Sequence, residues 1–245
     1  YFNRFESIQG DVFDINTLSD AMQGCDAVHV TLSKVNEADA VKSVLSVARK
    51  QDLKLISFVS GASVKDENRW FPMIDQKYLA EQAIIESGIP YLIFRPGWFF
   101  ESLRLFVRNN KASIIGKQPH PSRWIAAGDF AMMVANAFEK EEAKNNIFYT
   151  LGKNSYLMKE LLEQYCQELH PEINKVSTIP TGMLKFIGLI TGKKELRRVA
   201  SLFRYFEKVH VDADTDETYA MLGQPEMDFQ QWLKKRKDGI KHQDA

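Results

Sequence analysis

The chain has 245 residues, of which 44% are hydrophobic and 26% charged, proportions typical of a globular protein rather than a disordered one. This length is enough for one full hydrophobic core with an appended subdomain. Lys plus Arg number 32, as do Asp plus Glu, so the overall charge argues against nucleic acid and against an anionic membrane as partners. A small neutral or anionic ligand fits this balance.

Three features of the sequence indicate a cytoplasmic protein. The longest apolar segment, residues 183–190, is far shorter than the about 20 residues of a membrane span, and Lys185 interrupts it. Cys25 and Cys166 lie far apart without a partner at metal or redox spacing, which indicates free, buried thiols in a reducing compartment. Residues 1–8 do not resemble a signal peptide, and because the first residue is not Met we interpret the start as a cut end.

Short apolar segments alternate with helical patterns over the first hundred residues. Strands are expected at residues 5–9, 27–32, 53–60 and 90–94, and helices at residues 37–50 and 74–87. Gly88 follows the second of these helices, where a C-terminal cap is expected. Such alternation predicts a parallel sheet covered by helices, which is an α/β fold.

The pattern changes after Pro96. A short helix is expected at residues 101–108, a helix capped or flanked by Asp129 at residues 129–140, and a returning strand at residues 147–151. The rest of the chain is expected to be helical, at residues 157–169, 183–190, 195–206, 214–222 and 229–237. We therefore predict one domain over residues 1–150 and a smaller, mainly helical substrate or lid subdomain over residues 151–245.

Four segments carry motifs that belong together. They are QGDVFDINTLSDAMQGCDAV at residues 9–28, KLISFVSGASV at residues 54–64, DQKYLAEQAIIESGIPYLIF at residues 75–94 and RPGWFFESL at residues 95–103. In them the chain resembles the NmrA-like branch of the atypical short-chain dehydrogenase/reductases, over nearly its whole length. The motifs are most similar to those of quinone and triphenylmethane-dye reductases. The resemblance implies a doubly wound parallel Rossmann-type sheet that binds NADP or NAD, with NADP slightly favoured.

The first motif places Asp11 at the end of a family strand, beside the adenine of the cofactor. A carboxylate there can accept a hydrogen bond from an exocyclic amino group, because doubly wound sheets bind ligands at their strand ends. The alternative is a turn in which Asp11 bonds local backbone N–H groups. By the same resemblance, Thr31, Leu32 and Ser33 are candidate cofactor-binding residues at the end of the next strand.

The second motif supplies two hydroxyl groups after a strand. Ser60 or Ser63 fits the place of the serine that polarises a substrate carbonyl in related reductases, and Ser60 is also a candidate cofactor contact. The alternative is that both hydroxyls satisfy a turn.

In the third motif, the resemblance implies that Lys77 donates hydrogen bonds to the nicotinamide ribose. The alternative is an exposed lysine paired with Glu81 at i, i+4. Related enzymes carry a tyrosine acid four residues before this lysine, where this chain has Met73. Tyr78 cannot replace it, because adjacent helical residues point about 100° apart. Apart from Ser60, Ser63 and Lys77, no catalytic candidate emerges.

The fourth motif resembles the stretch that lines the nicotinamide end of the cleft in this branch. It implies cofactor contacts from Pro96, Gly97, Trp98 and Phe99, because glycine lets a backbone approach closely and aromatic rings offer flat apolar area. The alternative is that the aromatic side chains belong to the core. No metal site is expected, since the five histidines are scattered, and His29, within an apolar strand, is expected to be a core histidine.

No G-x-G-x-x-G or G-x-x-G-x-x-G occurs among the 13 glycines, so the pyrophosphate-binding turn is missing from this sequence. We expect a strand, helix and strand of about 50 residues to precede Tyr1 in a complete Rossmann sheet. On this interpretation, the sheet formed by the present sequence lacks its N-terminal strands. A genuinely short relative without tight dinucleotide binding is the other interpretation.

Together these observations predict an NAD(P)H-dependent oxidoreductase that reduces a quinone-like or other conjugated acceptor without a tyrosine acid. The alternative is a noncatalytic NAD(P)-binding redox sensor of the NmrA-like type. In either case we expect a small-molecule ligand and a possible homodimer in the cytoplasm, with no contact to nucleic acid or membrane.

Overall fold

The structure is a computed structural model and describes residues 6–32 and 36–241. The chain divides into two units by spatial proximity: Tyr1–Arg95 with Lys140–Phe148, and Pro96–Glu139 with Tyr149–Ala245. The strand that returns after residue 140 therefore groups with the first unit. The predicted division into a domain over residues 1–150 and a subdomain over residues 151–245 stays a prediction.

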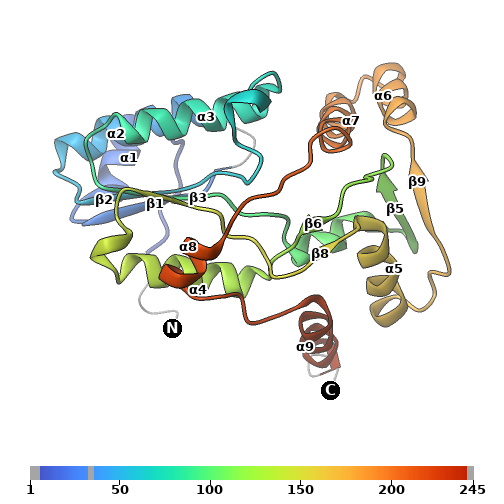
Figure 1. Ribbon diagram of the computed structural model, residues 1–245. Helices are drawn as coiled ribbons and strands as arrows, with labels where there is room; N and C mark the ends of the chain where they lie inside the picture. The colour runs from blue at the N-terminus through green and yellow to red at the C-terminus, as the bar shows by residue number, and fades with distance from the viewer. Residues whose placement is uncertain (1–5, 33–35, 242–245) are drawn as a thin grey trace. The chain divides into compact units, whose positions relative to one another are not determined.

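The first unit is built on a parallel four-stranded sheet in the order β1-β2-β3-β7. Its strands are β1 (Ala27–Val30), β2 (Leu55–Val59), β3 (Tyr91–Phe94) and β7 (Asn146–Phe148). The helices of this unit are α1 (Ile15–Met22), α2 (Glu37–Lys50) and α3 (Pro72–Ile85), with 3-10 turns at Asp66–Asn68 and Glu141–Ala143. Figure 1 shows α2 and α3 lying along one face of these strands. The predicted α/β fold with a Rossmann-type parallel sheet is confirmed.

The apolar patterns explain why these elements form. Strand β2 is buried almost throughout, so it has a continuous apolar sequence rather than an alternating one. Helix α2 runs over the residues predicted for it, with Asn36 as its N-cap and a buried face built on Val41, Val44 and Leu45. Gly88 has a φ of 77°, which only glycine adopts without strain, and it follows α3 as expected.

Three sequence expectations for this unit are wrong. The strand expected at residues 5–9 is not formed in its described part, residues 6–9, which is irregular and exposed because no neighbouring strand pairs with it. His29 is exposed rather than part of the core, since β1 pairs only with β2 within the described residues. Cys25 is exposed, whereas Cys166 is buried as expected.

His29 nevertheless has a defined partner. One ring nitrogen, Nδ1, lies 2.9 Å from the hydroxyl oxygen of Ser57, which is fully buried on β2. Partial desolvation lowers the pKa of His29, which favours the neutral imidazole at neutral pH.

The second unit combines helices with short strands. Its strands are β4 (Val107–Arg108), β5 (Lys111–Ile115), β6 (Ser122–Arg123), β8 (Ser155–Tyr156) and β9 (Val176–Ile179). Its helices are α4 (Ala127–Phe138), α5 (Met158–Leu169), α6 (Thr181–Ile190), α7 (Lys194–Phe206), α8 (Asp216–Leu222) and α9 (Phe229–Lys241), and Phe100–Phe106 is a 3-10 helix. The mostly helical C-terminal part is thus confirmed, but β9 interrupts it and pairs in parallel with β5.

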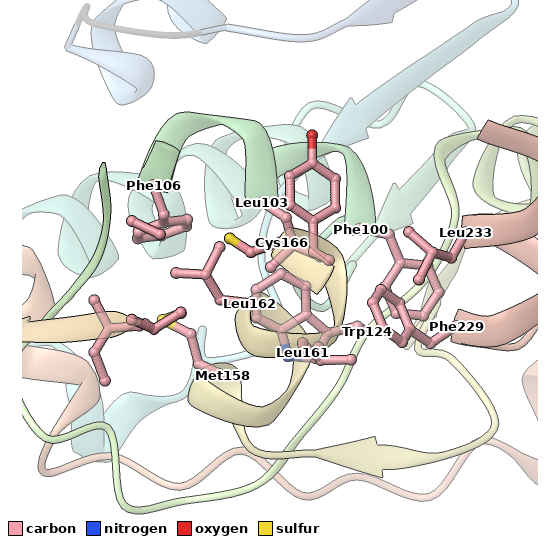
Figure 2. Close-up of a cluster of buried hydrophobic side chains, with 14 of the residues drawn as sticks. Phe100, Leu103, Phe106, Trp124, Met158, Leu161, Leu162, Cys166, Phe229 and Leu233 are labelled. Atoms are coloured by element: carbon pink, nitrogen blue, oxygen red, sulfur yellow. The ribbon is translucent and has the colours of Figure 1, made fainter. Parts of the chain in front are cut away.

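An aromatic core organises the second unit. Figure 2 shows Trp124 and Phe100 among the side chains of α5 and α9, and both rings are almost fully buried. The Phe100 ring lies 5.3 Å from that of Phe229, measured between centroids. Asp129 lies in the first turn of α4 but does not cap it, because its carboxylate accepts a hydrogen bond from the Met227 backbone N–H.

The backbone of Gly152 runs unusually close to another segment of this unit. A Cβ atom added to Gly152 would lie 1.7 Å from the backbone carbonyl oxygen of Trp124, a distance that requires main-chain movement. A Cβ added to Gly128, in the first turn of α4, would meet only the Met227 Cε atom at 3.7 Å.

We therefore predict opposite outcomes for two Gly→Ala substitutions. Gly152→Ala should lower the free energy of unfolding by about 3 kcal/mol, the upper range for overpacking. Gly128→Ala should leave it unchanged or raise it slightly, because Ala is the better helix former. Urea unfolding followed by circular dichroism measures both. Equal stability of the two variants would show that the close approach to Trp124 is not a constraint.

Candidate functional site

The carboxyl ends of the central strands gather the predicted cofactor residues of the first unit at one edge of the sheet. Thr31 and Leu32 follow β1, where Thr31 is exposed and Leu32 half-buried. Ser33 lies outside the described residues. Ser60 follows β2. This edge is where doubly wound parallel sheets bind ligands.

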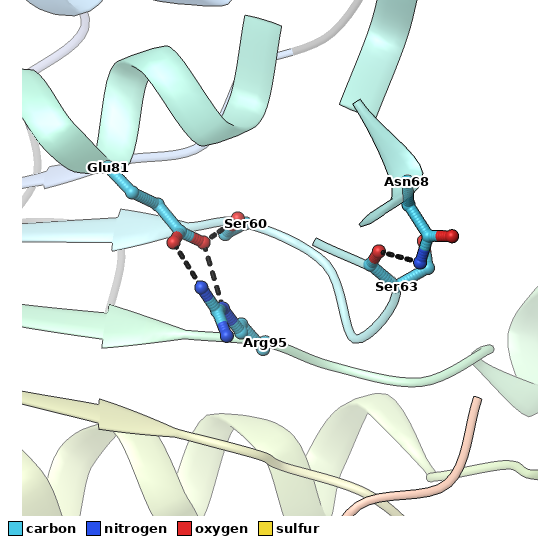
Figure 3. A network of polar contacts seen from close by, with 5 residues as sticks. All are labelled: Ser60, Ser63, Asn68, Glu81 and Arg95. Carbon is cyan, nitrogen blue, oxygen red and sulfur yellow. Dashed lines mark hydrogen bonds and ion pairs between the residues drawn. The ribbon is translucent and has the colours of Figure 1, made fainter. Parts of the chain in front are cut away.

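A buried carboxylate connects two of these strand ends. Glu81 on α3 is fully buried, and its Oε1 atom accepts a short hydrogen bond from the Ser60 hydroxyl group. The guanidinium of Arg95, directly after β3, donates to both carboxylate oxygens, with an Nε to Oε1 distance of 3.0 Å. Figure 3 shows this bidentate pair and the Ser60 contact. Such a pair is strong because charge assists both hydrogen bonds.

This network changes the interpretation of the two candidate serines. The Ser60 hydroxyl proton is directed at Glu81, so in this arrangement the group acts as a structural donor. Ser63 is buried, and its backbone carbonyl accepts a hydrogen bond of 2.9 Å from the Asn68 side chain (Figure 3). The Ser60 hydroxyl thus bonds to a helix, and Ser63 contributes its backbone carbonyl, so neither contact is the hydroxyl-to-turn bond of the alternative. A substrate role for either serine stays a prediction.

Lys77 occupies a second ion pair beside the first. Its ammonium nitrogen lies 2.7 Å from Oε2 of Glu37, in the first turn of α2, and both side chains are largely buried. The same ammonium lies 5.6 Å from the centroid of the Phe58 ring on β2. The alternative of an exposed lysine paired with Glu81 is therefore wrong, because the Glu81 carboxylate binds Arg95 and Ser60 instead.

Met73 occupies the position at which related enzymes carry a tyrosine acid. Met73, in the first turn of α3, is partly exposed. Tyr78 instead lies under the guanidinium of Arg69, 4.4 Å from its ring centroid, and Arg69 is in turn held by Asp75. This contact with Arg69 agrees with the expectation that Tyr78 does not replace the missing tyrosine.

Asp11 forms a local turn. Its Oδ1 atom accepts a hydrogen bond of 3.0 Å from the Phe13 backbone N–H, and its carbonyl accepts one from Asp14 N–H. Both geometries belong to the turn alternative. The side chain is exposed, so a contact to adenine stays a prediction.

The fourth motif lies in the second unit and packs there. A Cβ atom added to Gly97 would lie 2.3 Å from the backbone carbonyl oxygen of Arg123, which explains the glycine by close backbone approach. Trp98 stacks on Trp124 with a centroid distance of 5.5 Å, and Phe99 packs edge-on against Phe130. Pro96 is buried. These contacts match the core alternative, and their role at a cofactor stays a prediction.

Glu37 and Arg95 each form one of the two buried ion pairs of the site, and neither was among the residues predicted from the sequence. Glu37 pairs with a lysine 40 residues away, and Arg95 pairs with a glutamate 14 residues away. One signal was readable: an arginine that directly follows a fully apolar strand must find an acid or leave its charge poorly solvated.

Of the residues present, Lys77 is the one whose donors would suit the ribose of a dinucleotide. A Cβ atom added to Gly61, beside Ser60, would meet only the Lys77 side chain, at 3.8 Å. The Lys77 side chain therefore lies beside this loop, and its ion pair uses one of the three N–H donors of the ammonium group. Among the described residues, no cluster of three or more His, Cys, Asp or Glu could hold a metal ion.

The comparison that decides the family concerns more than half of the chain. A family model described as NAD(P)H-binding matches residues 3–141. The chain belongs to this NAD(P)H-binding family. The match covers the parallel sheet except β7, together with the segments after each of its first three strands. The expected cofactor class is therefore confirmed as NAD(P), without a choice between NAD and NADP.

Two curated relatives of this NAD(P)H-binding chain share one name, photosystem II assembly factor Ycf39. The protein of Trieres chinensis is 24% identical over 85% of this chain and 69% of its own length. That of Synechocystis is 21% identical over 75% of this chain and 60% of its own length. The aligned part thus leaves about a third or more of each relative unmatched.

Solved structures with the same fold come from several kinds of enzyme. A nucleoside-diphosphate-sugar epimerase of Staphylococcus aureus has a TM-score of 0.74 at 17% identity, covering 95% of this chain and 88% of its own. Triphenylmethane reductase of Citrobacter, complexed with NADP(H), has a TM-score of 0.71 at 16% identity, covering 92% and 81%. A quinone oxidoreductase of Escherichia coli that depends on NADPH has a TM-score of 0.70 at 16% identity, covering 93% and 82%.

We predict that loss of the Glu81 carboxylate strongly destabilises a variant that still carries the charged Arg95. Glu81→Leu should lower the free energy of unfolding by about 3–5 kcal/mol, because it removes the buried carboxylate that pairs with the Arg95 guanidinium and accepts the Ser60 hydrogen bond. The double variant Glu81→Leu/Arg95→Met should be more stable than the single one. Urea unfolding measures both.

The control is an ion pair at the surface of the same unit. Lys54 and Asp26 are 2.6 Å apart but both side chains are exposed, so Asp26→Asn should change stability little. Equal losses for Asp26→Asn and Glu81→Leu would refute the special role of the buried pair.

Proposed function

We propose that this protein is an NAD(P)H-dependent oxidoreductase that reduces a quinone-like or other conjugated acceptor. The observation that carries the proposal is helix α3, which holds Lys77 in place but has Met73, one turn earlier, where an acid would be required for carbonyl reduction. A small-molecule substrate, a cytoplasmic location and a possible homodimer belong to the same proposal.

Lys77 is suited to bind the cofactor's ribose. Glu37 fixes the ammonium group and balances its charge, so the two remaining N–H donors can point at neutral hydroxyl groups. The Phe58 ring beneath the lysine limits its freedom on the sheet side. NAD(P)H supplies a hydride when it is bound.

Three side chains that could be sought as the acid are unsuited to the role or engaged elsewhere. The Ser60 hydroxyl donates to Glu81, the Met73 thioether has no proton to give, and the Tyr78 ring is stacked beneath Arg69. A simple ketone needs an acid because reduction concentrates charge on one oxygen. A quinone or conjugated dye spreads the incoming charge over its ring system, so the missing acid matters less. NADP is slightly favoured by the names of the two reductases of like fold.

A second candidate function rests on the named relatives. Both curated relatives are assembly factors, and the engaged Ser60 and Lys77 side chains could serve binding without turnover. In this alternative the protein binds NAD(P) as a redox sensor or regulatory component. NADPH binding by calorimetry without oxidation across a broad acceptor panel would favour it.

We predict that Lys77 contributes to cofactor affinity. Lys77→Ala should raise the Kd for NADPH about tenfold or more, since it removes charge-assisted hydrogen bonds to the ribose. Lys50→Ala, at the exposed end of α2, is the matched control and should leave the Kd unchanged. Isothermal calorimetry on the whole protein measures both, and an unaltered Kd for Lys77→Ala would remove the ribose assignment.

We also predict a change of acceptor preference when the acid is restored. The natural sequence should oxidise NADPH with quinones and hardly at all with simple ketones. Met73→Tyr should raise ketone reduction at least tenfold, the low side of what a positioned general acid contributes, and alter quinone reduction little. Rates of NADPH oxidation followed by absorbance give the comparison. Efficient ketone reduction by the unmodified protein would overturn the acceptor assignment.

A further inference from the structure

Helix α6 exposes an apolar surface that the cofactor site does not use. Five large apolar side chains on this ten-residue helix are exposed: Met183 48%, Phe186 60%, Ile187 40%, Leu189 63% and Ile190 70%. Its one charged residue is Lys185. Clustered exposure of this kind marks an interaction surface, whereas single exposed apolar residues are ordinary.

The packing of α6 on α7 leaves this apolar face outward. Gly188 is the buried residue of α6, and a Cβ atom there would lie 2.9 Å from Arg197 Cγ and 3.0 Å from Leu196 Cβ of α7. Figure 1 shows the two helices side by side. At 100° per residue, the five exposed apolar side chains cover an arc of roughly 160° on the side opposite Gly188. Lys185 lies at the border of this arc.

A group of cations adjoins the apolar face. Residues 181–206, which we call the α6–α7 hairpin, contain six basic residues: Lys185, Lys193, Lys194, Arg197, Arg198 and Arg204. Their single acid is Glu195, which lies 3.4 Å from Arg198. Within the described part of the chain, Lys185, Lys193, Lys194 and Arg197 form no ion pair. The hairpin therefore combines an outward apolar surface with uncompensated positive charge.

We propose that the α6–α7 hairpin binds the surface of a membrane that contains anionic lipids. The apolar arc of α6 enters the interface between headgroups and acyl chains, and the cations of the hairpin attract lipid phosphates. Helix α6 lies in the plane of the interface, because ten residues span about 15 Å, half the hydrocarbon thickness. Among the described residues, no helix is long and apolar enough to cross a bilayer.

The charges favour a lipid surface over a second copy of the chain. In a two-fold dimer through α6, each apolar face would bring its own neighbouring cations toward those of the partner, and like charges at an interface are unfavourable. An anionic bilayer instead offers negative charge around an apolar interior. The balanced charge of the whole chain argued against a membrane partner, because it averages this basic segment with the acidic remainder of the chain.

Sedimentation with vesicles tests the proposal on the full chain. One vesicle type is pure phosphatidylcholine and the other an equimolar mixture with phosphatidylglycerol. The protein should sediment with the mixed vesicles at low salt, and less as salt is raised. Phe186→Ser/Ile190→Ser should reduce the partition coefficient by tenfold or more. Lys193→Gln/Lys194→Gln should reduce it about tenfold to thirtyfold.

The matched control is Met132→Ser, because Met132 on α4 is 62% exposed but has no such cluster around it, and its binding should equal that of the natural sequence. Circular dichroism confirms that each variant is folded. The proposal is overturned if the natural protein stays in the supernatant, or if Phe186→Ser/Ile190→Ser binds vesicles normally. Loss of self-association in light scattering, with vesicle binding retained, would identify the face as a contact with a second copy.

Discussion

The buried carboxylate of Glu81 is the constraint on which the first unit depends. Its desolvation is compensated by Arg95 and Ser60, which come from the ends of two neighbouring strands. Helix α3 is thereby fixed in rotation and in position along the sheet. Since Lys77 lies four residues earlier on the same helix face, the pair also determines where that ammonium group lies. One buried interaction thus sets both the structural side chains of this edge and the lysine for which we propose a cofactor contact.

Two separate ion pairs at this edge of the sheet limit the chemistry available there. Glu81 neutralises Arg95, and Glu37 neutralises Lys77, so neither cation presents an uncompensated charge to a ligand. What the site retains is the hydrogen-bond donors of Lys77 that Glu37 does not use. Such a site can position a ligand but contributes little proton transfer. This is why a hydride acceptor that stabilises its own charge, or binding without turnover, suits these residues better than carbonyl reduction.

Local signals in the sequence were reliable, and long-range pairing was not. Helix α2 was predicted at its observed bounds because its apolar residues recur at helical spacing. The partner of Lys77 was missed, since an i, i+4 glutamate is visible in sequence whereas Glu37 lies 40 residues away. Strand β9 was read as part of a helical tail because its pairing with β5 spans more than 60 residues. The family motifs located the sheet edge, but which side chains satisfy one another there depends on packing.

Charge averaging hid a further property of the chain. The total of 32 basic and 32 acidic residues is balanced, yet residues 181–206 carry six bases and one acid. The remaining residues therefore carry an equal excess of negative charge. Near an anionic bilayer this asymmetry would make the hairpin, rather than the acidic remainder of the chain, the part that is attracted to the lipid surface. The same distribution that supplies affinity would thus also orient the protein, with the apolar arc of α6 directed at the membrane.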